Sequence, residues 1–144
     1  MAPYVQLLAC VCAGLFAGGA WYITLVEHPA RVECGSDIAV TVFGPTYRRA
    51  SRAQATLAAL GFAAALQAWW LGSGVAWLVG GILLVLVIPY TLLVVMPVNL
   101  ELMNPALDNG SPQAVRLLRR WEQLHVVRAA LGFAAFLIFL LARQ

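Results

Sequence analysis

The 144-residue chain has very few charged side chains, and it contains no lysine. Only 10% of its residues are charged, whereas a soluble domain carries roughly 25%. A chain this short with so few charges cannot cover its own surface in water, so the composition excludes an ordinary soluble domain. The nine basic residues are all Arg, and the formal net charge is only +3. An excess this small within apolar sequence does not predict nucleic acid as a partner.

Cysteine is also scarce, with two residues in an apolar run (Cys10 and Cys12) and one in a polar segment (Cys34). Three cysteines at these spacings form neither a zinc-binding pattern nor a disulfide framework. We therefore expect two small packing residues and one incidental loop thiol.

Apolar residues, by contrast, make up 62% of the chain and form long charge-free runs. A transmembrane helix needs about 20 residues at about 1.5 Å each. The first run has no Lys or Arg before it, which favours a retained span over a cleaved signal peptide. Gly72-Ser73-Gly74 divides a second run into a hairpin. The sequence therefore predicts an all-α, integral membrane four-helix bundle in the lipid bilayer, a single domain over residues 1–144 with spans at 4–26, 53–71, 75–96 and 125–141.

The arginines predict the orientation of this bundle. Two long connections, residues 27–52 and 97–124, hold four and three Arg, whereas the opposite side has only Arg143. An even number of spans separates the two connections, so both lie on one side of the membrane. The positive-inside rule places both as cytoplasmic loops, with both termini outside the cytoplasm. We expect a multi-pass protein of a bacterial inner membrane.

Small residues in the first span predict close helix packing. Gly14 and Gly18 are four residues apart and form a surface of the kind that associates in lipid. That surface serves either the packing of the bundle itself or a homo-oligomer.

Prolines mark the expected helix ends. Pro29 and Pro97 are expected to end the first and third spans, because proline lacks the N–H that an internal helical hydrogen bond requires. Pro89 lies inside the third span and is expected to kink it. The kink either opens room for a ligand between the helices or serves helix packing alone. Residues 43–47, with the sequence Phe-Gly-Pro-Thr-Tyr, are expected to form a turn, either as a lid over the bundle mouth or as an interfacial segment.

The polar residues capable of chemistry gather at the cytoplasmic end of the predicted bundle. Trp121, His125 and Arg128 stand at i, i+4 and i+7 and therefore share one helix face. A His and an Arg on the packed face of a membrane helix are costly, so one interpretation is that they are functional. The other is an interfacial cluster in which Trp121 belongs to the aromatic belt, His125 is hydrogen-bonded and Arg128 extends its charged group to the interface. Glu122 opens the same span, and the other spans contribute further candidates at this end: Glu27, His28, Asn99 and Glu101.

The pair Glu122-x-x-His125 also suggests a metal site. This spacing puts a carboxylate and an imidazole on one face, as in di-iron bundles, although a second copy is absent. A copper, iron or zinc ion held at this end is therefore one alternative, with the candidate ligands His28, His125, Glu27, Glu101 and Glu122.

Several of these elements resemble the anthrone oxygenase-like family of small four-helix membrane proteins, many of them of unknown function. The elements are Pro89-Tyr90-Thr91, Met96-Pro97-Val98-Asn99-Leu100 and Trp121-Glu122-Gln123-Leu124-His125-Val126-Val127-Arg128, together with a Gly-rich first span closing on Pro29. The resemblance implies oxygenation of a polyketide anthrone to an anthraquinone without an obvious cofactor. The matching positions, expected to be catalytic, are His125, Arg128, Asn99 and Trp121.

These roles follow from the chemistry of an anthrone. His125 is the candidate base, Arg128 and Asn99 would hold the oxyanion that develops, and Trp121 would stack on a flat lipophilic substrate. In fungal members an Asn often stands where this chain has His125, so the identity of the base stays open. The alternative from another class is a non-catalytic membrane protein that binds a small lipophile or supports a partner complex.

Overall fold

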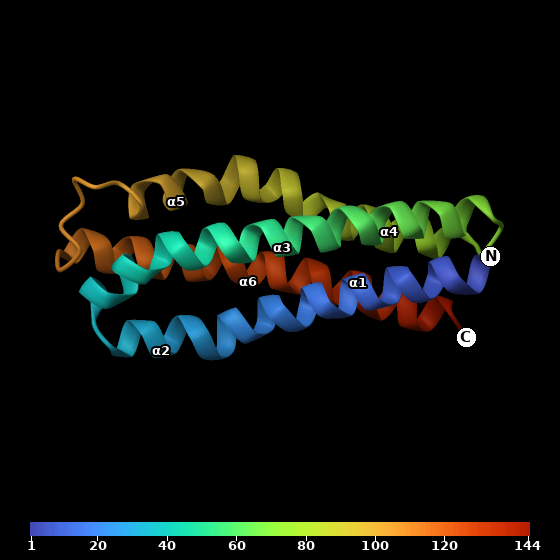
Figure 1. Ribbon diagram of the computed structural model, residues 1–144, viewed down its shortest axis with the longest axis horizontal. Coiled ribbons are helices and arrows are strands. Elements are labelled where there is room, and N and C mark those ends of the chain that lie inside the picture. Colours follow the sequence, from blue (N-terminus) through green and yellow to red (C-terminus); the bar gives the residue numbers. More distant parts are fainter.

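A computed structural model describes residues 1–144 and contains helices but no strands. The helices form four antiparallel rods, and both termini lie at the same end of the bundle (Figure 1). Around the bundle, α1 contacts α3, α3 contacts α4, α4 contacts α6 and α6 contacts α1, so neighbours in sequence are neighbours in space. The rods are α1 (Ala2–Tyr22) with η1 (Ile23–Glu27) and α2 (His28–Glu33); α3 (Ser36–Trp70); α4 (Val75–Tyr90) with η2 (Thr91–Val95) and α5 (Met96–Leu102); and α6 (Pro112–Ala142).

Three of the four rods are long and apolar enough to cross a membrane: Ala2–Glu33, Val75–Leu102 and Pro112–Ala142. The protein is therefore an all-α integral membrane four-helix bundle. The remaining rod, α3, is less apolar because it carries Gln54, Gln67 and an arginine cluster at its N-terminal half. At about 1.5 Å per residue, the 32-residue first rod is about 48 Å long, well beyond the roughly 30 Å hydrocarbon core. The rods thus extend past one side of the bilayer.

The expectation that Pro29 and Pro97 end their helices is wrong. In both rods a five-residue π-helical segment precedes the proline, and the helix then continues for several residues. A π segment adds a residue to the turn, which accommodates the proline's missing N–H and its ring. Thr24 and Thr91 lie in these segments, and each hydroxyl donates to the carbonyl four residues earlier, at 3.0 and 2.6 Å.

The prediction that residues 27–52 form a loop is also wrong, whereas the side of the membrane on which they lie stays a prediction. The first rod continues to Glu33, and α3 already begins at Ser36, so the connection is a tight turn at Gly35 with φ of 98°. Residues 43–47, expected as a turn, are part of α3, which continues through Pro45. Of the second predicted loop, 97–124, only residues 103–111 are non-helical. Arginine is a good helix former, so these charges mark a change of environment rather than the end of a helix.

Two apolar cores stabilise the bundle. The larger core lies toward the termini and includes Phe16, Trp77 and Phe139, with the last two rings stacked 5.2 Å apart. The smaller core lies at the opposite end and includes Phe43, Leu118 and Trp121. The eight buried polar side chains lie at the level of the smaller core or where the two cores meet: Thr24, His28, Arg31, Gln54, Thr91, Asn99, His125 and Arg128.

The two glycines of the first span have different surroundings. A Cβ at Gly14 would lie 3.1 Å from the Phe136 ring of α6, so this glycine packs within the bundle. A Cβ at Gly18 would meet nothing within 4 Å, so Gly18 faces outward. A closer approach occurs at Gly132, where a Cβ would lie 2.4 Å from the Phe16 ring. The homo-oligomer stays a prediction.

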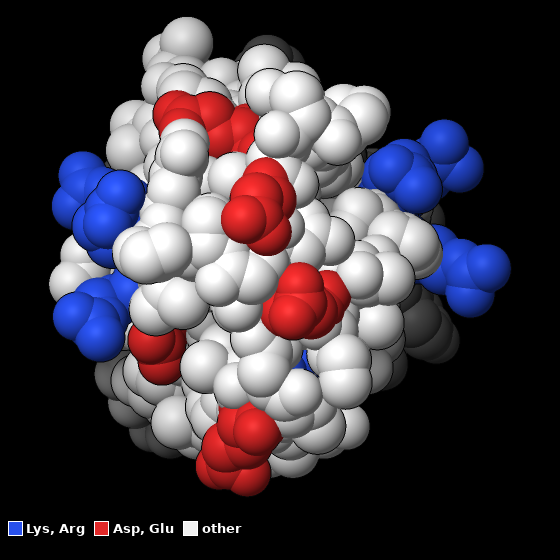
Figure 2. All heavy atoms as spheres, turned by 90° about the vertical axis from the view of Figure 1, so that its left-hand side faces the viewer, with Lys and Arg blue, Asp and Glu red and all other residues white.

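Charge is concentrated at the end of the bundle that lacks the termini. Figure 2 views this end: acidic side chains are scattered over the end itself, and arginines lie on its two flanks. The exposed arginines in this half of the bundle are Arg48, Arg49 and Arg52 on α3 and Arg116, Arg119 and Arg120 on α6.

Candidate functional site

The imidazole of His125 is held in one orientation by Thr24, which lies in η1. The Thr24 hydroxyl lies 3.0 Å from His125 Nδ1, and the same hydroxyl donates its only hydrogen to the Ala20 carbonyl. Thr24 therefore accepts from His125, so Nδ1 is the nitrogen that carries the hydrogen in the neutral form of the ring. That leaves the lone pair on Nε2 as the free base.

Arg128 is the second distinctive group of the site, because it is buried without an acidic partner. Only 5% of the residue is exposed, and its one hydrogen-bond partner is Gln54 Oε1, at 2.6 Å from Nη2. Its Nε has no partner, and the Phe16 ring packs 5.6 Å from the guanidinium carbon. The only ion pair in the protein joins Arg31 to Glu27 and does not include Arg128. Arg128 therefore brings uncompensated positive charge into the bundle.

Trp121 connects the two histidines of the protein. Its indole stacks on the His125 ring at 4.6 Å and contacts the His28 ring at 5.0 Å, and Phe43 packs edge-on against it at 5.3 Å. The Arg31 guanidinium lies 5.7 Å from the same indole. The Trp121 Nε1 is buried and has no hydrogen-bond partner. Trp121 thus fixes the plane of His125 by packing on it.

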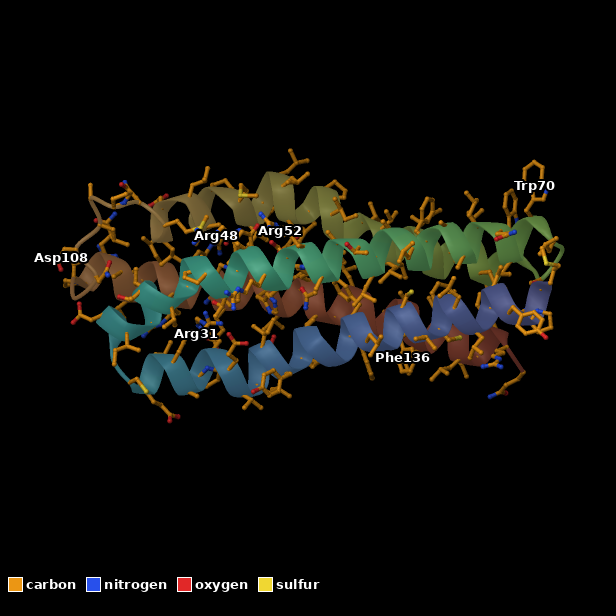
Figure 3. The ribbon with its side chains drawn as sticks, viewed as in Figure 1. Arg31, Arg48, Arg52, Trp70, Asp108 and Phe136 are labelled. Carbon is orange, nitrogen blue, oxygen red and sulfur yellow. The ribbon has the colours of Figure 1, made fainter.

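Three of the four residues predicted to be catalytic line one small cavity. Trp121, His125 and Arg128 share it with Glu27, with Arg31 and with a wall of α3 residues, and Figure 3 shows Arg31 pointing from α2 toward α3. Its volume of about 20 Å³ is enough for about one water molecule and no more. On α6, His125 lies about 26 Å from the helix end at Ala142, so this cavity sits close to one boundary of the hydrocarbon core.

A larger cavity of about 270 Å³ lies beside the small one, between α3 and the rod of α4, η2 and α5. Tyr47, Ser51 and Arg128 line both cavities, so they form the wall between them. The rest of the lining comes mainly from residues around Pro89 and the π segment that follows it: Val87, Ile88, Thr91, Leu92 and Met96. Room does open beside this proline, as one of the two sequence-based interpretations expected.

Asn99 is placed differently from the other three. It is fully buried, at 0% exposure, yet neither Oδ1 nor Nδ2 has a hydrogen-bond partner. It belongs to α5 and lines neither of the two cavities. The structure therefore does not bring Asn99 together with His125 and Arg128 around a shared space.

Sequence reasoning missed two residues that hold the site together, Thr24 and Gln54. Each is a polar residue inside an otherwise apolar span, and that was the available signal. Their partners lie 101 and 74 residues away along the chain, so the pairing itself could not be read from spacing.

The candidate metal ligands are dispersed. No three His, Cys, Asp or Glu side chains form a group that could hold a metal ion. Glu27 pairs with Arg31 at 3.2 Å, Glu122 and His28 line a separate cleft between α2 and α6, and Glu101 lies at an exposed surface near Asp108. The residues present do not fit a copper, iron or zinc centre.

The fold and the site together define a class: a four-helix membrane bundle with a buried His and a buried Arg that forms no ion pair, in a small cavity next to a larger lateral one. Residues 43–138, which are 96 of the 144, match the anthrone oxygenase family, and the chain belongs to that family. The resemblance seen in the sequence is thereby confirmed. No curated protein and no solved structure matches the chain. The matched region includes Gln54, His125 and Arg128 but begins after Thr24 and His28.

Proposed function

We propose that this protein is a membrane-embedded oxygenase that converts a lipophilic aromatic compound of the anthrone type to the corresponding quinone, without a bound cofactor. One observation carries the proposal: a His whose Nδ1–H is fixed by Thr24 lies in the same cavity as an Arg that has no acidic partner. Together they supply a base and an unpaired positive charge that can stabilise an anion. Membership of the anthrone oxygenase family supports the same chemistry.

The reaction needs little more than these two groups. With the anthrone in the lateral cavity, Nε2 of His125 takes a proton from its acidic CH₂ through the one water molecule for which the small cavity has room. The resulting enolate is stabilised as an aromatic phenolate beside the Arg128 guanidinium, which lines both cavities. An electron passes from this anion to O₂, and the two radicals join in a new C–O bond. The imidazolium returns its proton to the peroxide, and loss of water, with the second hydrogen of the same carbon, leaves the C=O. The sum is anthrone and O₂ giving anthraquinone and water.

The remaining predicted residues have supporting roles in this proposal. Trp121 keeps the His125 ring in plane through its 4.6 Å stack. Asn99, which has an unpaired amide and lines neither of the two cavities, would meet the substrate only after a rearrangement of α5. We also propose that the arginine-rich end faces the cytoplasm of a bacterial cell, because exposed Arg lies on the flanks of that end and only Arg143 lies near the other.

The second candidate function is binding of a small lipophile without turnover. The 270 Å³ cavity favours it, because its mostly apolar lining and open side suit a ligand that partitions from lipid. In this case His125 and Arg128 would orient the ligand rather than transform it.

Oxygen uptake with 1,8-dihydroxyanthrone, by protein in neutral nanodiscs, tests the proposal. We expect uptake above the rate of spontaneous oxidation, and a loss of at least about 100-fold in the His125→Ala variant, which is the usual contribution of a general base. His28→Ala is the matched control, since it removes the other imidazole on Trp121 but leaves the cavity with its base. An active His125→Ala variant would rule out His125 as the base. No uptake by the unaltered protein, with a bound anthraquinone, would favour the binding function.

A further inference from the structure

We propose that the substrate carries a second acidic group, such as a carboxylate on the aromatic system, and that Arg52 binds it at the outer rim of the lateral cavity. The inference deepens the proposed function, on which it depends. It names the substrate class as aromatic compounds with two anionic positions at different depths.

The lateral cavity is lined by two arginines, one exposed and one buried, among mostly hydrophobic residues. Arg128 is its buried inner residue, at 5% exposure, and Arg52 is its exposed residue from α3. Figure 3 shows Arg52 on the side of α3 that faces the α4–α5 rod. The rest of the lining is mainly apolar and includes Ala55, Val87 and Leu92.

No negative charge balances these two guanidinium groups. The cavity has no Asp or Glu among its lining residues, and neither Arg52 nor Arg128 takes part in an ion pair. A guanidinium forms two parallel hydrogen bonds with a carboxylate, and this geometry discriminates well against neutral groups. The charges therefore select a ligand that is negative at both ends.

The depth of the two charges favours a substrate over a membrane lipid. A phospholipid has its anionic group at the interface and only hydrocarbon below it, so it would pair with Arg52 and leave Arg128 unpaired among apolar chains. A rigid aromatic acid can place its enolate oxygen at Arg128, which also lines the small cavity of His125, and its carboxylate at Arg52. The two arginines are thus matched by one flat ligand that spans the cavity.

Binding of unreactive product analogues tests this inference apart from any activity. The probes are anthraquinone-2-carboxylate and its neutral carboxamide, measured by quenching of tryptophan fluorescence in nanodiscs of phosphatidylcholine. The quantity compared is the ratio of the two dissociation constants within each variant, so that differences in partition into lipid cancel. Arg49→Gln is the matched control, because it removes the same charge from α3 but lines neither the small nor the lateral cavity.

We expect the unaltered protein and the Arg49→Gln variant to prefer the carboxylate by about tenfold, as for a charge-assisted hydrogen bond at a partly exposed site. Arg52→Gln should reduce that preference to about twofold or less while binding of the carboxamide stays unchanged. Equal binding of both probes by the unaltered protein would overturn the inference. So would an equal loss in Arg49→Gln and Arg52→Gln, since that would indicate a general surface charge. Because no turnover is measured, a protein that lacks oxygenase activity can still pass or fail this test.

Discussion

Gln54 and Arg128 are predicted to stabilise the bundle only when both are present, because either side chain without the other leaves a buried polar group unpaired. Gln54 is buried, and its Oε1 accepts from Arg128 at 2.6 Å. Gln54→Leu keeps a similar volume but leaves the guanidinium without a hydrogen-bond partner. Arg128→Met removes the charge but leaves the Gln54 oxygen unpaired. Each single variant therefore removes one half of the pair and keeps the cost of burying the other.

The magnitude follows from the charge on the donor. A hydrogen bond to a charged group contributes about 1.5–3 kcal/mol, although polar pairs in membranes average closer to about 0.6 kcal/mol because the unfolded chain finds other partners. We expect Gln54→Leu to lower the free energy of unfolding by about 1.5–2 kcal/mol and Arg128→Met by about 1 kcal/mol. The double variant should return to within about 1 kcal/mol of the original, because both polar groups are then gone.

Reversible unfolding in mixed micelles, run as a double-mutant cycle, measures these free energies. Gln67→Leu is the matched control on the same helix, where Gln67 is exposed and the expected change is below about 0.5 kcal/mol. The pairing would be refuted if the two single losses simply add in the double variant. Oxygen uptake provides a second readout, since the stable double variant should lose about 100-fold or more in rate when the positive charge is absent.

Two further predictions concern the neighbours of this pair. Thr24→Val removes the acceptor of the His125 Nδ1–H, so kcat for oxygen uptake should fall about tenfold with KM unchanged. Thr24→Ser should retain the rate, and a Val variant of full activity would contradict the assigned tautomer. Gly132→Ala places a Cβ 2.4 Å from the ring of the fully buried Phe16, which should cost about 1–3 kcal/mol in unfolding free energy. Gly18→Ala, with open space around it, should cost nothing measurable, and an equal cost at both glycines would contradict the packing.

The sequence predicted the bundle well because hydrophobic runs report directly on the length of chain that the bilayer requires. It also placed Trp121, His125 and Arg128 on one face, and the structure buries all three beside the same cavity. This succeeded because helical periodicity fixes which residues on one helix share a direction. The functional roles of these residues stay predictions.

The prediction failed where charge was taken as the end of a helix. Residues 36–52 are helical although they include three arginines, because a helix that leaves the bilayer needs no change of backbone, only a change of side chains. Pro29 and Pro97 were expected to end their helices, but a π segment before each proline lets the helix continue. Such a segment cannot be predicted from the proline alone. Contacts between helices, such as Thr24 with His125, are not encoded in local spacing at all.

The choice of Gln54 as the partner of Arg128 is the strongest indication of what the site is for. A carboxylate at this position would neutralise the guanidinium and stabilise the bundle without a ligand, but it would also repel an anion. A glutamine oxygen fixes the direction of the guanidinium through one hydrogen bond while leaving its charge available. The remaining Nε–H of Arg128 has no partner, and the residue lines both cavities. The unpaired charge lowers the stability of the protein without a ligand, and a bound anion would restore that stability. This favours a site for an enolate over a merely structural arginine.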